Sequence, residues 1–163
     1  MTPLTTMKMH QGDVVRDPKP KKRKGKSARQ KTEEYTDSWC RELVKLRDKK
    51  CVTCGARGFK DEDGHWWAAR DDGRVVLLDW SHLFSRGRDA TRWVMDATYA
   101  QCRICHALHH RQDQHPLRSY AYKRLGQERM DELYLLSRTT PKFSLDYIKN
   151  LGDAFRDRCR ELS

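Results

Sequence analysis

The sequence lacks long apolar runs: only 37% of its 163 residues are hydrophobic, and 35% are charged. No segment approaches the ~18 consecutive apolar residues of a membrane-spanning helix, so we expect no membrane partner. The apolar stretch of roughly 7 to 15 residues that marks a secretory signal is also missing. We therefore expect a cytoplasmic protein, with one small domain and appendages.

Six cysteines are then expected in a reducing compartment, where paired cysteines favour metal binding over disulfides. Four of them form two C-x2-C pairs, Cys51 with Cys54 and Cys102 with Cys105, separated by 47 residues. A C-x2-C turn lets both thiolates bind one ion, and two such pairs complete a tetrahedral Zn²⁺ site. The spacing predicts a structural zinc that ties distant segments of a small domain together.

Positive charge is concentrated near the beginning of the chain. The net charge is +11, and residues 1–31 hold 10 basic and two acidic residues. These cations include a run without apolar periodicity, Lys21, Lys22, Arg23 and Lys24. We predict that residues 1–33 form a disordered basic arm, which binds nucleic acid through counterion release without reading sequence. A solubilising tail or a nuclear-import signal would have the same composition.

Helical and strand signals alternate along the rest of the chain. Trp39, Leu43 and Leu46 recur at helical spacing after Thr36 or Asp37, which predicts a capped helix over 37–50. Residues 65–70 and 74–80 flank a turn sequence, 71–73, and predict a β-hairpin. Further helices are expected over 103–114, from Pro116 to Gly126, over 127–137, and from Ser144 to about Leu162.

Two groups of apolar residues are assigned to the interior. Cys40 and Cys159 have no partner at ligand spacing, and we interpret them as ordinary buried or half-buried thiols. The tryptophans favour packing in the core and hairpin over a base-stacking platform; they are Trp39, Trp66, Trp67, Trp80 and Trp93.

Histidines gather between and after the cysteine pairs. His82 ends the stretch Asp79-Trp80-Ser81-His82, and the segment after Cys105 holds His106, His109 and His110. In this order of parts the sequence resembles the HNH, or ββα-metal, nucleases. From Asp79 onward it is most similar to the NinG/Rap recombination endonucleases of lambdoid phages. That similarity rests on Asp79-x-x-His82, Gln101-Cys102-x-x-Cys105 and Tyr122-x-x-Leu125-Gly126-Gln127-Glu128-x-x-Asp131-Glu132.

Counted from Cys51, the resemblance covers about two thirds of the chain. It implies an α+β fold: a zinc-stapled ββα-metal core over 34–115 with an N-terminal helix, and a helical extension over 116–163 packed on the core. The implied function is metal-dependent, structure-specific DNA cleavage by a phage or prophage protein in the bacterial cytoplasm. Its implied substrates are branched recombination intermediates such as D-loops and four-way junctions, and a homodimer is compatible with it.

Phosphodiester hydrolysis of this kind needs a base, a divalent cation and a group that orients the base. His82 is the candidate base, because imidazole accepts a proton near neutral pH. For Mg²⁺ or Mn²⁺ we favour His106 and Asp79, and His110 lies one helical turn beyond His106. His109 is the weaker alternative. As purely structural alternatives, His82 would be a strand-end histidine bonded to the backbone, and Asp79 and His110 would be surface or capping residues.

The sequence departs from the HNH pattern at two positions. Ser81 stands where many family members have Asp, and Ala97 stands where the family's middle Asn orients the base. Asp96, Thr98 or the backbone would then have to orient it. Three arginines after the base form either a solvated face or a set of phosphate contacts; they are Arg86, Arg88 and Arg92.

Two other functions remain open. A zinc-stapled DNA-binding protein could have the HNH scaffold without cleavage, given Ala97 and Ser81. A ribosome-associated zinc protein with its basic arm on RNA would explain the composition and the cysteines, but it gives no reason for the placement of His82 and His106.

Overall fold

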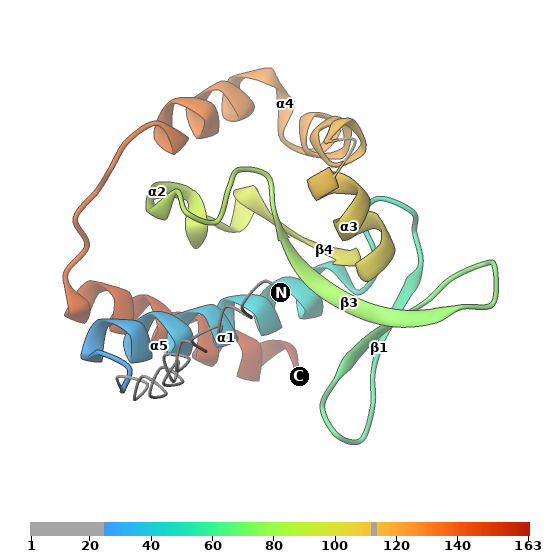
Figure 1. Cartoon of the computed structure of the whole chain (residues 1–163), viewed down its shortest axis with the longest axis horizontal. Helices are drawn as coiled ribbons and strands as arrows, with labels where there is room; N and C mark the ends of the chain where they lie inside the picture. Colours follow the sequence, from blue (N-terminus) through green and yellow to red (C-terminus); the bar gives the residue numbers. More distant parts are fainter. Residues whose placement is uncertain (1–24, 112–113) are drawn as a thin grey trace, which may run out of the picture.

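The computed structural model describes residues 25–111 and 114–163, so the predicted arm cations Lys21 to Lys24 lie outside the described residues. The elements follow in the order α1 (Ala28–Asp48), β1 (Arg57–Lys60), β2 (Trp66–Ala69), β3 (Val75–His82), α2 (Asp89–Arg92), the 3-10 turn η1 (Met95–Ala97), β4 (Thr98–Cys102), α3 (Arg103–Arg111), α4 (His115–Ser137) and α5 (Leu145–Leu162). Helices surround one small sheet (Figure 1), which confirms the α+β class. Within the described ranges, no helix is long and apolar enough to cross a membrane.

The sheet is antiparallel with strand order β1-β2-β3-β4. Its centre confirms the predicted hairpin, because β2 and β3 pair across a turn in which Gly73 has a φ of 80°. The pairing of β3 with β4 sets Asp79 opposite Gln101 and His82 opposite Thr98. Strands β1 and β4 were not predicted. The short helix α2 and the turn η1 lie between β3 and β4, and helix α3 follows β4 without a loop.

Helix α1 begins earlier than the sequence analysis expected. Ser27 is its N-cap, and Ser27 and Gln30 form a reciprocal capping box. Residues 28–33, which we assigned to the arm, are therefore helical. Asp37, expected as a cap, lies inside the helix and is buried. Helix α1 packs along α5 and against β4, and Cys40 and Cys159 are buried thiols as predicted (Figure 1).

Helices α4 and α5 follow the predicted boundaries closely. Gly126 has a φ of 78° and breaks the helical path within α4, as its position predicted. Ser144 caps α5 by accepting a hydrogen bond from the Tyr147 backbone NH at 3.1 Å. Before the break, Leu117 and Ala121 of α4 join a second apolar cluster with Leu83, the residue after His82. This cluster fixes the loop that follows β3. Among the tryptophans, the interior role is confirmed for Trp66, Trp80 and Trp93, which are buried.

Helices α1 and α5 approach each other closely at Gly152. The Thr36 hydroxyl donates a hydrogen bond to the Ile148 carbonyl at 2.8 Å. A Cβ atom at Gly152 would lie 2.7 Å from Thr36 Oγ1 and 2.9 Å from the ring of Tyr35. The absence of a side chain at position 152 therefore allows the two helices to touch.

We expect Gly152→Leu to lower the free energy of unfolding by about 3 kcal/mol, because an overpacked contact must push the helices apart. Urea unfolding monitored by circular dichroism measures this loss. The matched control is Asn150→Leu, at an exposed position of the same helix, which should change stability by less than ~0.5 kcal/mol. Equal stabilities of the two variants would contradict a close helix contact at Gly152.

Candidate functional site

Four thiols meet where the loop after α1 approaches β4 and α3. They belong to Cys51, Cys54, Cys102 and Cys105, and their sulfur atoms all lie within 4.8 Å of one another. The Val52 NH donates to the Ala100 carbonyl at 2.9 Å, which holds the loop against β4. Gly55 allows the tight turn after the first pair with a φ of 78°. The predicted four-cysteine set is confirmed as one cluster that could hold a metal ion such as zinc.

Arg70 extends from the end of β2 over the thiol cluster. Its guanidinium donates to Cys102 Sγ at 3.2 Å and to Cys54 Sγ at 3.4 Å. A zinc ion bound by four thiolates carries a net charge of about −2, which an adjacent cation stabilises. The sequence analysis missed this residue, because only the pairing of β2 with β3 brings it to the cysteines.

We expect Arg70→Gln to weaken zinc binding by roughly 10 to 100-fold, the usual cost of losing a group that supports metal ligands. Competition with a chromophoric chelator measures the change. Arg74→Gln is the matched control, because Arg74 lies in the same hairpin but bonds Asp72 and not the thiols. Indistinguishable chelator curves for Arg70→Gln and wild type would rule out this role.

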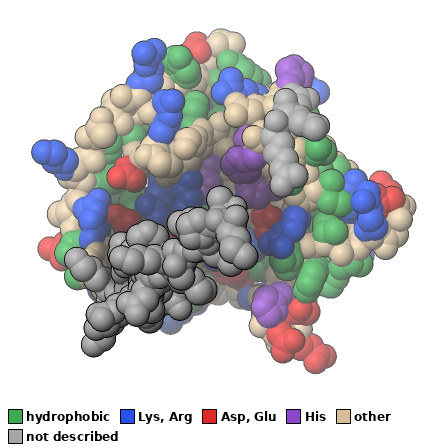
Figure 2. Space-filling model, viewed as in Figure 1, with side chains coloured by type: hydrophobic (Ala, Val, Ile, Leu, Met, Phe, Trp, Pro, Cys, Tyr) green, Lys and Arg blue, Asp and Glu red, His purple; other side chains and the backbone are tan. Residues whose placement is uncertain are grey.

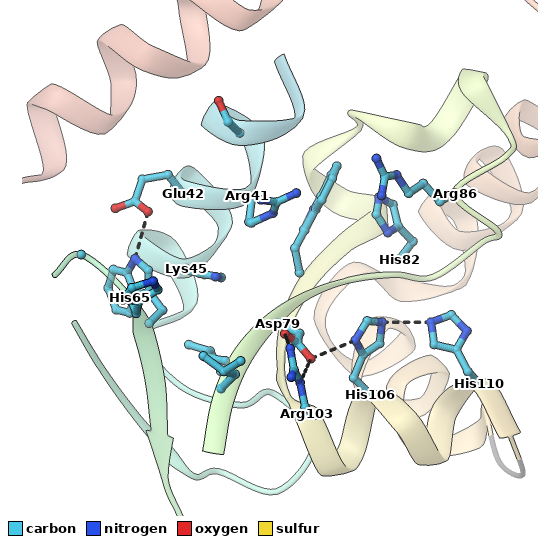
Figure 3. Close-up of a pocket in the computed structure, with 16 residues that line it drawn as sticks. Arg41, Glu42, Lys45, His65, Asp79, His82, Arg86, Arg103, His106 and His110 are labelled. Atoms are coloured by element: carbon cyan, nitrogen blue, oxygen red, sulfur yellow. Dashed lines mark hydrogen bonds and ion pairs between the residues drawn. The ribbon is translucent and has the colours of Figure 1, made fainter. Parts of the chain in front are cut away.

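Asp79, His106 and His110 form a continuous row of polar contacts (Figure 3). Asp79 Oδ2 lies 3.5 Å from His106 Nδ1, and His106 Nε2 lies 2.9 Å from His110 Nε2. Arg103 donates to both carboxylate oxygens of Asp79 at 3.3 Å. The structure therefore brings the three predicted cation ligands together. They lie in a line with His106 between the others, and not in a compact three-ligand cluster.

His82 ends β3 beside this row. Its side chain is 9% exposed, and its ring packs on Trp80 with the centroids 4.2 Å apart. Nε2 is buried and has no hydrogen-bond partner among the described residues. Burial, with the positive charge of Arg86 second, lowers the pKa of His82 to about 4. The imidazole is therefore neutral near pH 7, so one of its two ring nitrogens carries a lone pair.

The buried imidazole makes stability depend on pH. Between pH ~4 and ~6.5 the unfolded chain binds a proton at His82 that the folded chain does not bind, so stability declines as the pH falls through this window. The decline assigned to His82 is at most about 3 kcal/mol. We expect His82→Gln, which cannot titrate, to lose less stability than wild type between about pH 7 and about pH 5 in urea unfolding. Parallel losses in the two proteins would contradict the lowered pKa.

A hollow of about 770 Å³ lies between α1, β3 and α3, and His82 opens on it. Figure 2 shows histidine and basic side chains gathered near the centre of this face. A smaller hollow of about 430 Å³ adjoins it on the other side of His82. His82, Arg86 and His110 line both hollows, so the two adjoin at these residues, and we call the pair the groove. His109 is buried, and of these two hollows it lines the second and not the one that holds Asp79.

The three predicted phosphate-binding arginines have different environments. Arg86 forms a hydrogen-bonded ion pair with Asp37, but about half of its side chain stays exposed in the groove. Arg88 donates to the Ser137 carbonyl at 3.0 Å and lines the second hollow. Arg92 has a side chain that is only 12% exposed, and it is held by Asp37 and Glu33. Arg92 is thus committed to an internal ion pair, which corrects the expectation that it faces phosphate.

A backbone hydrogen bond joins Ala97 to the loop that follows His82. The Ala97 carbonyl accepts a hydrogen bond from the Leu83 NH at 2.8 Å, which anchors the residue after His82. The two side-chain candidates are occupied elsewhere, because Asp96 pairs with Arg129 at 2.9 Å and the Thr98 hydroxyl points to the Val94 carbonyl at 3.4 Å. Of the three alternatives left open, the structure places only the backbone in contact with this loop.

An exposed group of metal-ligand type lies at the β1–β2 turn and comprises Asp61, Asp63 and His65. The Asp61 carboxylate is already used there, because it accepts from the Trp67 indole at 2.6 Å and the His65 backbone at 2.7 Å. These hydrogen bonds stabilise the β1–β2 turn, and they explain why Asp61 lies beside His65 with no metal ion needed.

A comparison of the chain with protein-family models, with curated proteins and with solved structures finds no match.

Proposed function

We propose that the protein is a divalent-metal-dependent DNA endonuclease of the HNH type that hydrolyses phosphodiester bonds. The observation that carries the proposal is the convergence of a buried, neutral imidazole, His82, and the row Asp79-His106-His110 on one cation-lined hollow. The succession of β3, β4 and α3, with His82 ending the first strand and His106 on the helix, agrees with the arrangement that the resemblance implies.

In this proposal, His82 removes a proton from a water molecule that attacks the phosphorus atom. Arrival of an anionic phosphate would raise the pKa of His82 toward neutrality, where a general base is most effective. Asp79, His106 and His110 would hold the Mg²⁺ or Mn²⁺, with Arg103 orienting the Asp79 carboxylate. A bound divalent cation supplies stabilisation of the negative charge that develops on the phosphate and the leaving 3′ oxygen.

The cysteine cluster supports the same site. Cys105 directly precedes His106 in α3, and Cys102 ends β4. A zinc ion on these thiolates fixes the first turn of α3 against the loop after α1, and so sets the distance between His106 and His82. We propose a structural role for zinc on this ground.

The substrate and setting are inferred from the resemblance. We propose that a phage or prophage protein acts in the bacterial cytoplasm on branched DNA such as D-loops and four-way junctions, and that two copies can pair on such a junction. The basic arm would add affinity without sequence preference. The groove on both sides of His82 provides a path for a DNA strand past the base.

A panel of labelled duplex, flap, D-loop and four-way junction, incubated with Mg²⁺ or Mn²⁺, tests the proposal. We expect cleavage of a branched substrate that depends on added metal. The second candidate is a zinc-stapled DNA-binding protein without cleavage, which the linear arrangement of Asp79, His106 and His110 favours. Tight junction binding with every strand left intact, and supercoiled plasmid left unnicked, would select that alternative.

A further inference from the structure

Helix α1 supplies two cations to the hollow that neither the HNH resemblance nor the sequence analysis assigned. Arg41 and Lys45 lie four residues apart on one face of α1, and both line the hollow. Figure 3 shows them across the hollow from the row formed by Asp79, His106 and His110. One wall of the hollow therefore carries the candidate metal ligands Asp79, His106 and His110. The opposite wall carries Arg41 and Lys45, and we call it the basic wall.

Lys45 is the more unusual of the two, because its residue is only 9% exposed. Among residues 25–111 and 114–163, no carboxylate lies within ion-pair distance of its ammonium. Burial, with the positive charge of Arg41 second, lowers the pKa of Lys45 to about 8, although Asp79 and Glu42 oppose the shift. A buried cation without a partner destabilises a fold, and a bound anion would offset this cost.

The neighbouring carboxylates are already used. Glu42 accepts from Lys60 at 2.8 Å and from the Trp66 indole at 3.0 Å, and Asp79 is bonded by Arg103. Arg41 is exposed, and its guanidinium lies 5.9 Å from the centroid of the Trp80 ring. The basic wall therefore keeps positive charge that no residue of the described chain neutralises at close range.

We propose that Arg41 and Lys45 form a phosphate-binding site on α1, which holds one backbone phosphate of a nucleic acid strand lying between α1 and α3. This inference rests on the proposed function, because the strand that binds Arg41 and Lys45 is the strand that the endonuclease would cleave. Arg41 can donate two parallel hydrogen bonds to phosphate oxygens. Lys45, one helical turn further along α1, would attract the same phosphate as a single positive charge. The strand is thereby pressed toward His82, which packs on the same Trp80 ring.

The test measures binding of a fluorescent four-way DNA junction by anisotropy, without added Mg²⁺ or Mn²⁺, over a range of salt concentrations. We expect Lys45→Met and Arg41→Gln each to weaken binding about tenfold and to reduce the slope of log affinity against log salt by about one. Lys142→Met, at an exposed position lining neither hollow, is the control for general loss of charge and should bind nearly as wild type.

Thermal unfolding of the same variants separates a ligand site from a structural role. Lys45→Met should unfold at the wild-type temperature or above it, because the change removes a buried, unpaired charge. Should this variant fail to fold, the inference is overturned for Lys45, and exposed Arg41 still tests the site. Wild-type affinity and salt slope in Arg41→Gln and Lys45→Met, or no junction binding by wild type, would overturn the proposal.

The outcomes also separate this inference from the endonuclease proposal. A protein that binds the junction through Arg41 and Lys45 but cleaves no substrate would support the phosphate site and remove the cleavage activity. Cleavage of branched DNA by the wild type, with unchanged DNA affinity in Arg41→Gln and Lys45→Met, would support the endonuclease and remove the phosphate site.

Discussion

Replacing Cys102 by serine should release the bound metal and unfold the domain. A structural zinc site contributes about 10 to 16 kcal/mol of apparent binding free energy at neutral pH, which is comparable to the whole stability of an ordinary domain. Cys102 is fully buried at the end of β4, and serine in its place would leave the cluster with three thiolates. Metal analysis and circular dichroism of the purified variant measure the two losses.

Cys159→Ser provides the control, because Cys159 is equally a buried cysteine but lies on α5, outside the cluster. This variant should keep one zinc ion per chain and lose little stability. The zinc prediction would be withdrawn if the wild-type protein were folded and soluble without any bound metal.

Replacing His82 by alanine should abolish most DNA cleavage while leaving zinc content and DNA affinity in place. A positioned general base typically contributes a factor of ~10² to 10⁴ to the rate and little to binding of the substrate. Single-turnover cleavage of a branched substrate, with junction binding measured in parallel, checks both halves of this expectation. His115→Ala, at the exposed start of α4 and outside both hollows, should keep the wild-type rate.

The expected behaviour of His106→Ala is different, which separates the two roles. Its defect should be partly relieved at high Mg²⁺ concentration, because Asp79 and His110 would still hold a weakened site. The defect of His82→Ala should not respond to metal. Wild-type cleavage by His82→Ala would show that His82 is not the base, and the binding-protein alternative would then account better for the scaffold.

Elements with local signals were predictable from the sequence. The hairpin of β2 and β3, the break at Gly126, the cap at Ser144 and the four-cysteine cluster each depend on a turn residue, a capping residue or a short spacing. Strand β4 had no such signal, since all five of its residues are buried and show no alternation. Strand β4 is defined by its hydrogen-bonded pairing with β3, which is a tertiary contact.

The start of α1 was missed for a related reason. Residues 28–33 are polar except for Ala28, and their helical start is marked by the capping box of Ser27 and Gln30 rather than by apolar periodicity. In the site, His106 and His110 were predictable because they directly follow the second cysteine pair. Arg41, Lys45 and Arg70 were not, because tertiary packing alone carries them to the hollow and the thiols.

The position of the thiol cluster has a consequence for the protein during its synthesis. Cys51 and Cys54 leave the ribosome well before Cys102 and Cys105, and the hairpin, His82 and β4 all lie between the two pairs. With the proposed structural zinc, the hollows around His82 would form only once α3 has been made and the ion has joined both ends of this segment. On this proposal a newly made chain would stay inert until it has acquired its metal, and the cell's zinc supply would set how soon it matures.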